Sequence, residues 1–178
     1  AEKNSLAIIC LDLIFGGFEL CDELRSEIRK QVGIENTLVN FSHSHSSASL
    51  GARGDTRISN DTDSKWNDAT LDKILSIVKE AKKRAEPVSL RMGRAPVQVG
   101  FNRRLVNKEN GHVYMGVNRK GPVVPWVNVL CADSIESGKP IAVLYETAAH
   151  PVIVPDSSKL TSADFPGAAA KAIHKALG

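Results

Sequence analysis

Two histidines separated by one residue, His43 and His45, are the feature whose residue types and spacing point most directly to chemistry. They follow a β-type run at 37–41, and residues i and i+2 of an extended chain project from the same face. Zinc accepts neutral imidazole nitrogens at about 2.0–2.1 Å, but its sites usually have three or four ligands. The spacing therefore leaves two interpretations open, a metal site and a pair of surface histidines in a serine-rich loop.

A third histidine, His150, also comes directly after an apolar run, at 141–149. Ligands of open α/β sheets bind outside the carboxyl ends of the strands, so His150 could emerge at the same sheet edge as His43. Taken alone, His150 is better explained as a hydrogen-bonded structural histidine. The placement of His43, His45 and His150 after β-type runs favours a shared site.

The arginine Arg103 lies in the segment 102–104, which follows an extended run at 96–101. A guanidinium fork at the end of a strand can bind a carboxylate, a phosphate or an amide oxygen through two hydrogen bonds. The alternative is a solvated basic turn. The histidines His112 and His174 have no comparable setting, and we expect both to be solvated.

The elements that position these residues begin with a βαβ pattern. An apolar run at 5–13 predicts a strand covered on both faces. Apolar residues at every fourth position predict a helix over 19–32 that ends at Gly33, and a second strand covers 37–41. The polar stretch 46–63 predicts a mobile loop, since it has few apolar residues to bury.

The rest of the chain continues to alternate strands and helices. We predict helices at 66–86 and 162–177, and an extended segment at 88–106. A connection rich in Gly, Asn, Lys and Pro follows at 107–125. Strands are expected at 126–131 and 141–145, on either side of a turn at 136–139. The fold class is therefore α/β, a layered sandwich with a mixed β-sheet flanked by helices, formed as one domain over residues 1–178.

Composition excludes several classes of protein. A net charge of +3 is too small to indicate nucleic-acid or anionic-membrane binding, and no apolar run reaches the ~20 residues of a transmembrane segment. The three cysteines, Cys10, Cys21 and Cys131, form no CxxC pair and predict buried thiols. No phosphate-binding glycine loop or GxSxG turn is present.

Five short motifs occur in an order that resembles the N-terminal catalytic region of the neutral/alkaline non-lysosomal ceramidases. In that family a strand ends near an Asp, and a His-Thr-His loop, an Asn-Arg segment, a His-Pro pair and a Ser-x-Asp-x-x-Gly helix start follow. The corresponding residues here are 8–12, 41–46, 102–104, 149–151 and 162–167. The resemblance covers nearly the whole chain.

The resemblance implies a zinc-dependent hydrolase that splits the amide of an N-acyl sphingosine into a fatty acid and a sphingoid base. By position, His43 and His150 correspond to two zinc ligands, and His45 and Arg103 to active-site residues. Zinc would polarise the amide carbonyl, and arginine or histidine donors would hold the developing oxyanion. An N-acyl lipid or related amide is the implied substrate, and a secreted or periplasmic location is typical of the family.

The sequence also departs from the family pattern. Residues 46–49 replace the usual Ser-Gly-Pro-Gly, and Val124 stands where bacterial relatives tend to carry Asp. The family's remaining ligands, a Glu and a Tyr, belong to segments after Gly178, so the resemblance predicts a fragment without ceramidase activity of its own. Two alternatives stay open: a non-catalytic metal- or ligand-binding domain, and a zinc hydrolase with a more polar substrate.

Overall fold

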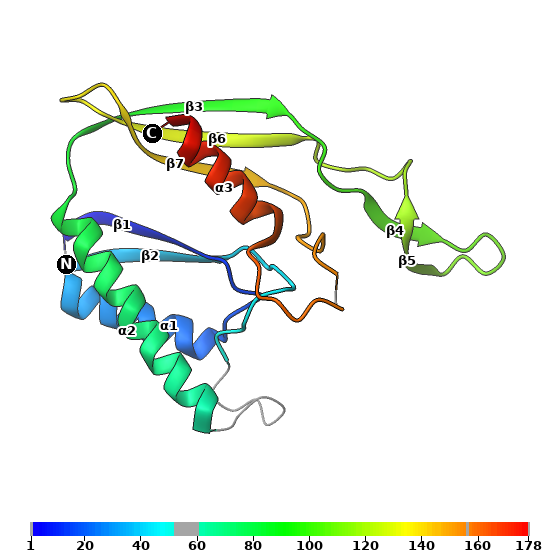
Figure 1. Ribbon diagram of the computed structural model, residues 1–178, viewed down its shortest axis with the longest axis horizontal. Helices are drawn as coiled ribbons and strands as arrows, with labels where there is room; N and C mark the ends of the chain where they lie inside the picture. The colour runs from blue at the N-terminus through cyan, green and yellow to red at the C-terminus, as the bar shows by residue number, and fades with distance from the viewer. Residues whose placement is uncertain (1, 52–60, 156, 178) are drawn as a thin grey trace. The chain divides into compact units, whose positions relative to one another are not determined.

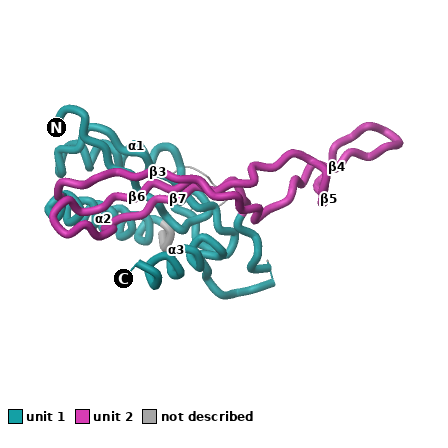
Figure 2. Tube along the Cα trace, turned by 90° about the horizontal axis from the view of Figure 1, so that it is seen from above, with its two compact units in different colours: residues 1–85, 151–178 teal, residues 86–150 magenta. Residues whose placement is uncertain are grey.

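The chain consists of two compact units, which Figure 2 distinguishes by colour. The computed structural model describes residues 2–51, 61–155 and 157–177. Unit 1 contains residues 1–85 and 151–178, and unit 2 contains residues 86–150. Helices and strands both occur, so the predicted α/β class is confirmed. In the described part of the chain, no helix combines the length and apolarity that a membrane crossing requires.

Unit 1 begins with the predicted βαβ arrangement (Figure 1). Strand β1 (Glu2–Leu11) leads to helix α1 (Phe18–Glu27), a π-helical turn η1 (Ile28–Val32) and strand β2 (Ile34–Phe41). β1 and β2 pair in parallel, which confirms the prediction from the sequence.

Gly33 ends the first helical segment, as the sequence predicts. Its backbone is left-handed, with φ of 76°, and its N–H donates to the Ile28 carbonyl at 3.1 Å. Glycine adopts this conformation without a Cβ clash, so the chain can turn sharply from η1 into β2.

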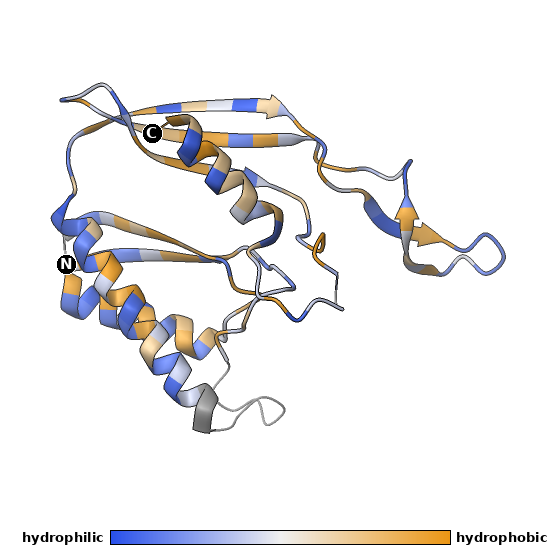
Figure 3. Ribbon diagram, viewed as in Figure 1, coloured by the Kyte–Doolittle hydropathy of each residue, from blue (hydrophilic) through white to orange (hydrophobic). Residues whose placement is uncertain are grey.

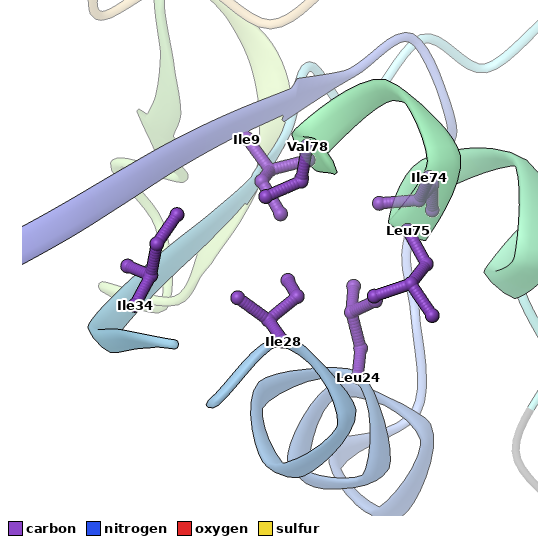
Figure 4. Close-up of a cluster of buried hydrophobic side chains, with 7 residues drawn as sticks. All are labelled: Ile9, Leu24, Ile28, Ile34, Ile74, Leu75 and Val78. Carbon is purple, nitrogen blue, oxygen red and sulfur yellow. The ribbon is translucent and has the colours of Figure 1, made fainter. Parts of the chain in front are cut away.

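The core of unit 1 lies between these elements and helix α2 (Asp61–Lys83). Figure 3 shows that α1 and α2 alternate between hydrophobic and hydrophilic residues along their length, as amphipathic helices do. Figure 4 shows the buried cluster they form with the strands: Ile9, Leu24, Ile28, Ile34, Ile74, Leu75 and Val78. This burial holds the parallel pair and therefore the loops at its carboxyl end.

Strand β1 alternates between buried and exposed side chains, whereas the sequence predicted a strand covered on both faces. Ile9 is buried, whereas its neighbours Leu6 and Ile8 are 52% and 47% exposed. Cys10 is exposed for the same reason, which corrects the expectation of a buried thiol there. Cys21 and Cys131 are buried as predicted, and burial raises the pKa of both thiols.

Half of the predicted mobile loop 46–63, residues 52–60, lies outside the described residues. Before that gap the chain is fixed, since Leu50 is fully buried and its N–H donates to the Phe15 carbonyl at 2.9 Å. After it, α2 already begins at Asp61. The loop prediction overlooked Leu50, a single apolar anchor in a polar stretch.

Unit 2 is built from antiparallel strands. β3 (Val88–Pro96), β6 (Trp126–Ser134) and β7 (Pro140–Thr147) form a sheet in the order β3-β6-β7. A separate hairpin joins β4 (Asn102–Val106) to β5 (Val113–Asn118).

Two expectations are corrected by this arrangement. The described strands form three separate sheets, parallel in unit 1 and antiparallel in unit 2, in place of one mixed sheet. The segment 107–125 contains β5, where a connection was expected, because the short β-type run at 113–117 is hidden among Gly, Asn and Lys residues.

A bidentate ion pair crosses the face of the β3–β6 ladder. The Arg91 guanidinium binds both carboxylate oxygens of Asp133, with Nη2 to Oδ1 at 2.9 Å, and Nη2 also approaches Cys131 Sγ at 3.5 Å. The hydrogen bond from Arg91 holds the pKa of Asp133 below its ordinary value. Asp133 is 13% exposed and Arg91 63% exposed, so water screens part of the interaction.

The first prediction concerns the core of unit 1. Replacing Ile28, which is fully buried, with alanine removes three methyl or methylene groups from the cluster and is expected to lower the free energy of unfolding by about 2–5 kcal/mol. The matched change Ile77→Ala, at a position 59% exposed on α2, should cost far less. Urea denaturation in a Trp126→Phe background, followed by Trp66 fluorescence, measures both. Equal losses would contradict the assigned core.

The second prediction concerns pH. A carboxyl whose pKa is lowered by folding stabilises the folded state above its ordinary pKa, and this stabilisation is lost as the pH falls through the folded value. We therefore expect Asp133→Asn to destabilise unit 2 at neutral pH and to approach wild type as the pH drops from about 5 to about 2. Denaturation followed by Trp126 fluorescence in a Trp66→Phe background tests this, with Glu136→Gln as control. A difference independent of pH would exclude the ion pair as its cause.

Candidate metal centre

The candidate site lies at the carboxyl end of the parallel pair in unit 1. After β2 ends at Phe41, the N–H of Ser42 donates to the Leu11 carbonyl at 2.9 Å, and that of His43 to the Leu13 carbonyl at 3.1 Å. The loops that follow the two strands are therefore hydrogen-bonded to each other. This is the position at which α/β sheets bind ligands.

His43 does not continue the strand, contrary to the premise of the sequence argument. Its backbone is left-handed, with φ of 63°, a conformation that is uncommon outside glycine but less so for histidine than for bulky residues. The His43 ring is held by a hydrogen bond of 2.6 Å between its Nδ1 and the Ile14 carbonyl. A tight turn, and not the alternation of an extended chain, therefore directs the side chain.

His45 lies beside His43 on the same loop. The two rings meet edge to face, with their centroids 5.1 Å apart and their planes at 90°. The N–H of His45 donates to the Pro151 carbonyl at 3.3 Å, which fastens this loop to the segment that begins at residue 151. Both histidine side chains are exposed.

The third histidine, His150, is connected to this loop through the next residue in the chain, Pro151. It is the last residue of unit 2, and its peptide bond leads directly to Pro151 in unit 1, whose carbonyl accepts the His45 N–H. His43, His45 and His150 each offer one ring nitrogen, and these atoms all lie within 4.8 Å of one another. The sequence expected this convergence from one shared sheet, whereas β2 and β7 belong to different sheets.

The donor set fits a divalent metal such as zinc. Because a carbonyl oxygen only accepts hydrogen bonds, the contact with Ile14 requires the proton of a neutral His43 on Nδ1. Nε2 then carries the lone pair with which imidazole binds a metal. Histidine ligands of metals commonly donate their other ring N–H to a backbone carbonyl in this way. Nitrogens about 2.0–2.1 Å from one tetrahedral zinc ion lie about 3.3 Å apart, so a separation of 4.8 Å would have to contract by about 1.5 Å.

Arg103, at the start of β4, lines a pocket of about 400 Å³ within unit 2. His150 and Asn102 line the same pocket, as does Val124, the position at which the ceramidase pattern tends to have Asp. The Asn102 side chain donates to the Pro122 carbonyl at 2.9 Å and accepts from the Arg104 N–H at 2.9 Å. The structure therefore brings two of the predicted site residues, Arg103 and His150, to one pocket.

The remaining candidates are placed as the sequence suggested. His112 and His174 are exposed and do not belong to the histidine group. At the start of helix α3 (Asp164–Leu177), the Ser162 hydroxyl accepts the Asp164 N–H at 3.0 Å, so Ser162 caps the helix.

Sequence reasoning missed the backbone groups that orient the site. The Ile14 and Pro151 carbonyls carry no side-chain signature, and their roles depend on contacts between residues far apart in the chain. Pro151 itself gave one usable signal, because a proline directly after a candidate ligand fixes the backbone there.

The same fold occurs in two solved ceramidase structures. A crystal structure of neutral ceramidase from Pseudomonas aeruginosa matches 88% of this chain at 15% identity and a TM-score of 0.66. A ceramidase complexed with C2 matches 92% at 18% identity and a TM-score of 0.69. Each match covers 26% of the ceramidase chain, so this chain spans about a quarter of their length. No protein-family model matches the sequence, and no curated protein matches it by sequence.

The third prediction follows from the Ile14 contact. In alkaline buffer, the neutral ring of His43 should be the Nδ1–H tautomer, with Nε2 unprotonated. Long-range ¹H–¹⁵N NMR of histidine-labelled protein distinguishes the two tautomers, and the exposed His174 provides a reference ring. A protonated Nε2 on His43 would contradict the assignment of that nitrogen as a metal ligand.

Proposed function

We propose that this chain contributes the histidine ligands of a zinc-dependent amide hydrolase of the ceramidase type. The observation that carries the proposal is the convergence of His43, His45 and His150 within 4.8 Å at the carboxyl end of a parallel strand pair. The shared fold with two ceramidase structures supports the same reaction class. The substrate we infer is an N-acyl lipid, cleaved to a fatty acid and an amine.

In this proposal His43 and His150 hold the metal. Zinc bound there supplies the Lewis acidity that polarises an amide carbonyl and activates water. His43 suits the role because the Ile14 carbonyl fixes both its tautomer and its ring orientation. His150 is suited by the short peptide connection to Pro151, which fixes its backbone next to the loop of His43 and His45.

His45 and Arg103 act on the substrate in this proposal. His45, edge to face with His43, is placed to exchange a proton with the reacting amide. Arg103 lines the pocket that His150 also lines, and its guanidinium can hold the oxygen on which negative charge develops. Hydrolysis forms a bond between the water oxygen and the acyl carbon and breaks the C–N bond. A proton from that water is transferred to the nitrogen of the departing amine.

The fourth prediction tests the metal. Equilibrium dialysis with zinc, followed by elemental analysis, should show zinc bound to the wild-type chain and strongly reduced zinc in His43→Ala and His150→Ala. His174→Ala removes an exposed histidine outside the group and should bind like wild type. Equal losses in all three variants would mean that zinc binds elsewhere or without specificity.

Enzymatic activity is tested by measuring the release of fatty acid from a short-chain N-acyl sphingosine in the presence of zinc. Turnover that is abolished by a chelator and by His150→Ala supports the amide hydrolase and would overturn the expectation that this chain has no ceramidase activity of its own. Turnover that survives chelation excludes it. Zinc bound through the histidines without turnover favours a metal-binding module that does not catalyse the reaction on its own.

A further inference from the structure

Ser44, which lies between the two loop histidines, points away from them. Its side chain is fully buried, whereas His43 and His45 are exposed. The Ser44 hydroxyl donates to the Ser162 carbonyl at 2.7 Å, a contact between residues 118 positions apart. The turn at 43–45 therefore presents two imidazoles on one side while a single hydroxyl anchors it on the other.

The anchor at Ser162 is held by further hydrogen bonds within unit 1. The Ser162 N–H donates to the Ser46 carbonyl at 2.8 Å, so the histidine loop is joined to Ser162 at both Ser44 and Ser46. The carboxylate of Asp164, a buried residue, accepts the N–H of Val154 at 2.8 Å and that of Phe165 at 2.6 Å. Asp164 thereby connects the start of α3 to the segment that begins after His150.

Backbone conformation gives independent evidence that residues in this network are strained. His43 and Asp164 both have left-handed backbones, with φ of 63° and 52°, and Asn4 is the third such non-glycine residue in the described part of the chain. Such conformations are strained and persist only where surrounding contacts enforce them. Two of these residues, His43 and Asp164, lie at the ends of one hydrogen-bond network. We take this as a sign that the network fixes the backbone conformation of the histidine loop.

We propose that Ser44 is a positioning residue, whose hydrogen bond to Ser162 keeps His43 and His45 close enough together to serve a single metal ion. The inference rests on the proposed function, because the metal gives that separation its use. Ser44 itself touches neither metal nor substrate and acts through the two histidines. The Asp164 carboxylate extends the same support to the residues that follow His150.

The test compares Ser44→Ala with Ser158→Ala. Ser158 offers a matched change in the same unit, since its hydroxyl accepts the nearby Leu160 N–H at 3.2 Å. Far-UV circular dichroism first establishes that each variant is folded. Should Ser44→Ala not fold, Asp164→Asn takes its place, because the amide keeps the volume and loses one of the two acceptor oxygens.

Two readouts separate positioning from general stability. The first is the nuclear Overhauser contact between the His43 and His45 rings in the metal-free protein, which should be present in wild type and Ser158→Ala and lost in Ser44→Ala. The second is titration with Co²⁺, whose visible absorption reports coordination. We expect Ser44→Ala to bind Co²⁺ about 10–100-fold more weakly than wild type, with an altered spectrum.

The outcomes distinguish the two proposals. A folded Ser44→Ala with an unchanged ring contact, or with unchanged Co²⁺ affinity and spectrum, overturns the positioning role. A wild-type chain that binds no Co²⁺ overturns the proposed metal function, and the ring contact then tests positioning by itself. Loss of ring contact and affinity in Ser44→Ala, with Ser158→Ala like wild type, supports the inference.

Discussion

The hydrogen bond from the His43 ring to the Ile14 carbonyl joins the loops that follow β1 and β2, and the candidate metal centre depends on it. It holds an imidazole whose own backbone is left-handed, so the contact offsets part of the strain that the turn introduces. It also selects the tautomer in which Nε2 carries the lone pair of the ring. One contact thus sets the conformation, orientation and protonation of the same side chain.

The support for that contact comes from ordinary packing. Ile9 on β1 and Ile34 on β2 are buried against Leu24 and Ile28 of the first helical segment, and α2 closes the cluster. Burial of this kind fixes the two strands in register, and the register brings Leu11 opposite Phe41 at the carboxyl end. The loops that carry the candidate site are well positioned because they begin from two strands whose register is fixed.

Elements governed by local pattern were predicted well from the sequence. The four-residue spacing of Leu20, Leu24 and Ile28 defined a helix face, and Gly33 marked its end, since both signals depend on residues close in the chain. The βαβ order likewise implied the parallel pairing that is observed. The three histidines were recognised as one group because each follows a β-type run.

What the sequence could not indicate depends on long-range contacts. The left-handed turn at His43 results from hydrogen bonds to residues about thirty positions away, and the anchor at Ser44 joins residues 118 positions apart. The division of the strands into three sheets follows from which edges pair, and β-type runs carry little information about their partners. The family resemblance named His43 and His150, but it gave no sign that Ser44 would connect their surroundings.

Unit 2 is an insertion in the sequence of unit 1, which the chain leaves after Ala85 and rejoins at Pro151. His150 is the final inserted residue, so the peptide bond that closes the insertion also carries a candidate ligand. Lengthening or shortening strands and turns elsewhere in unit 2, such as the hairpin β4–β5, does not alter that bond. Such a chain can diversify the walls of its pocket by insertion and deletion while the attachment of the third histidine to the loop of the other two stays constant.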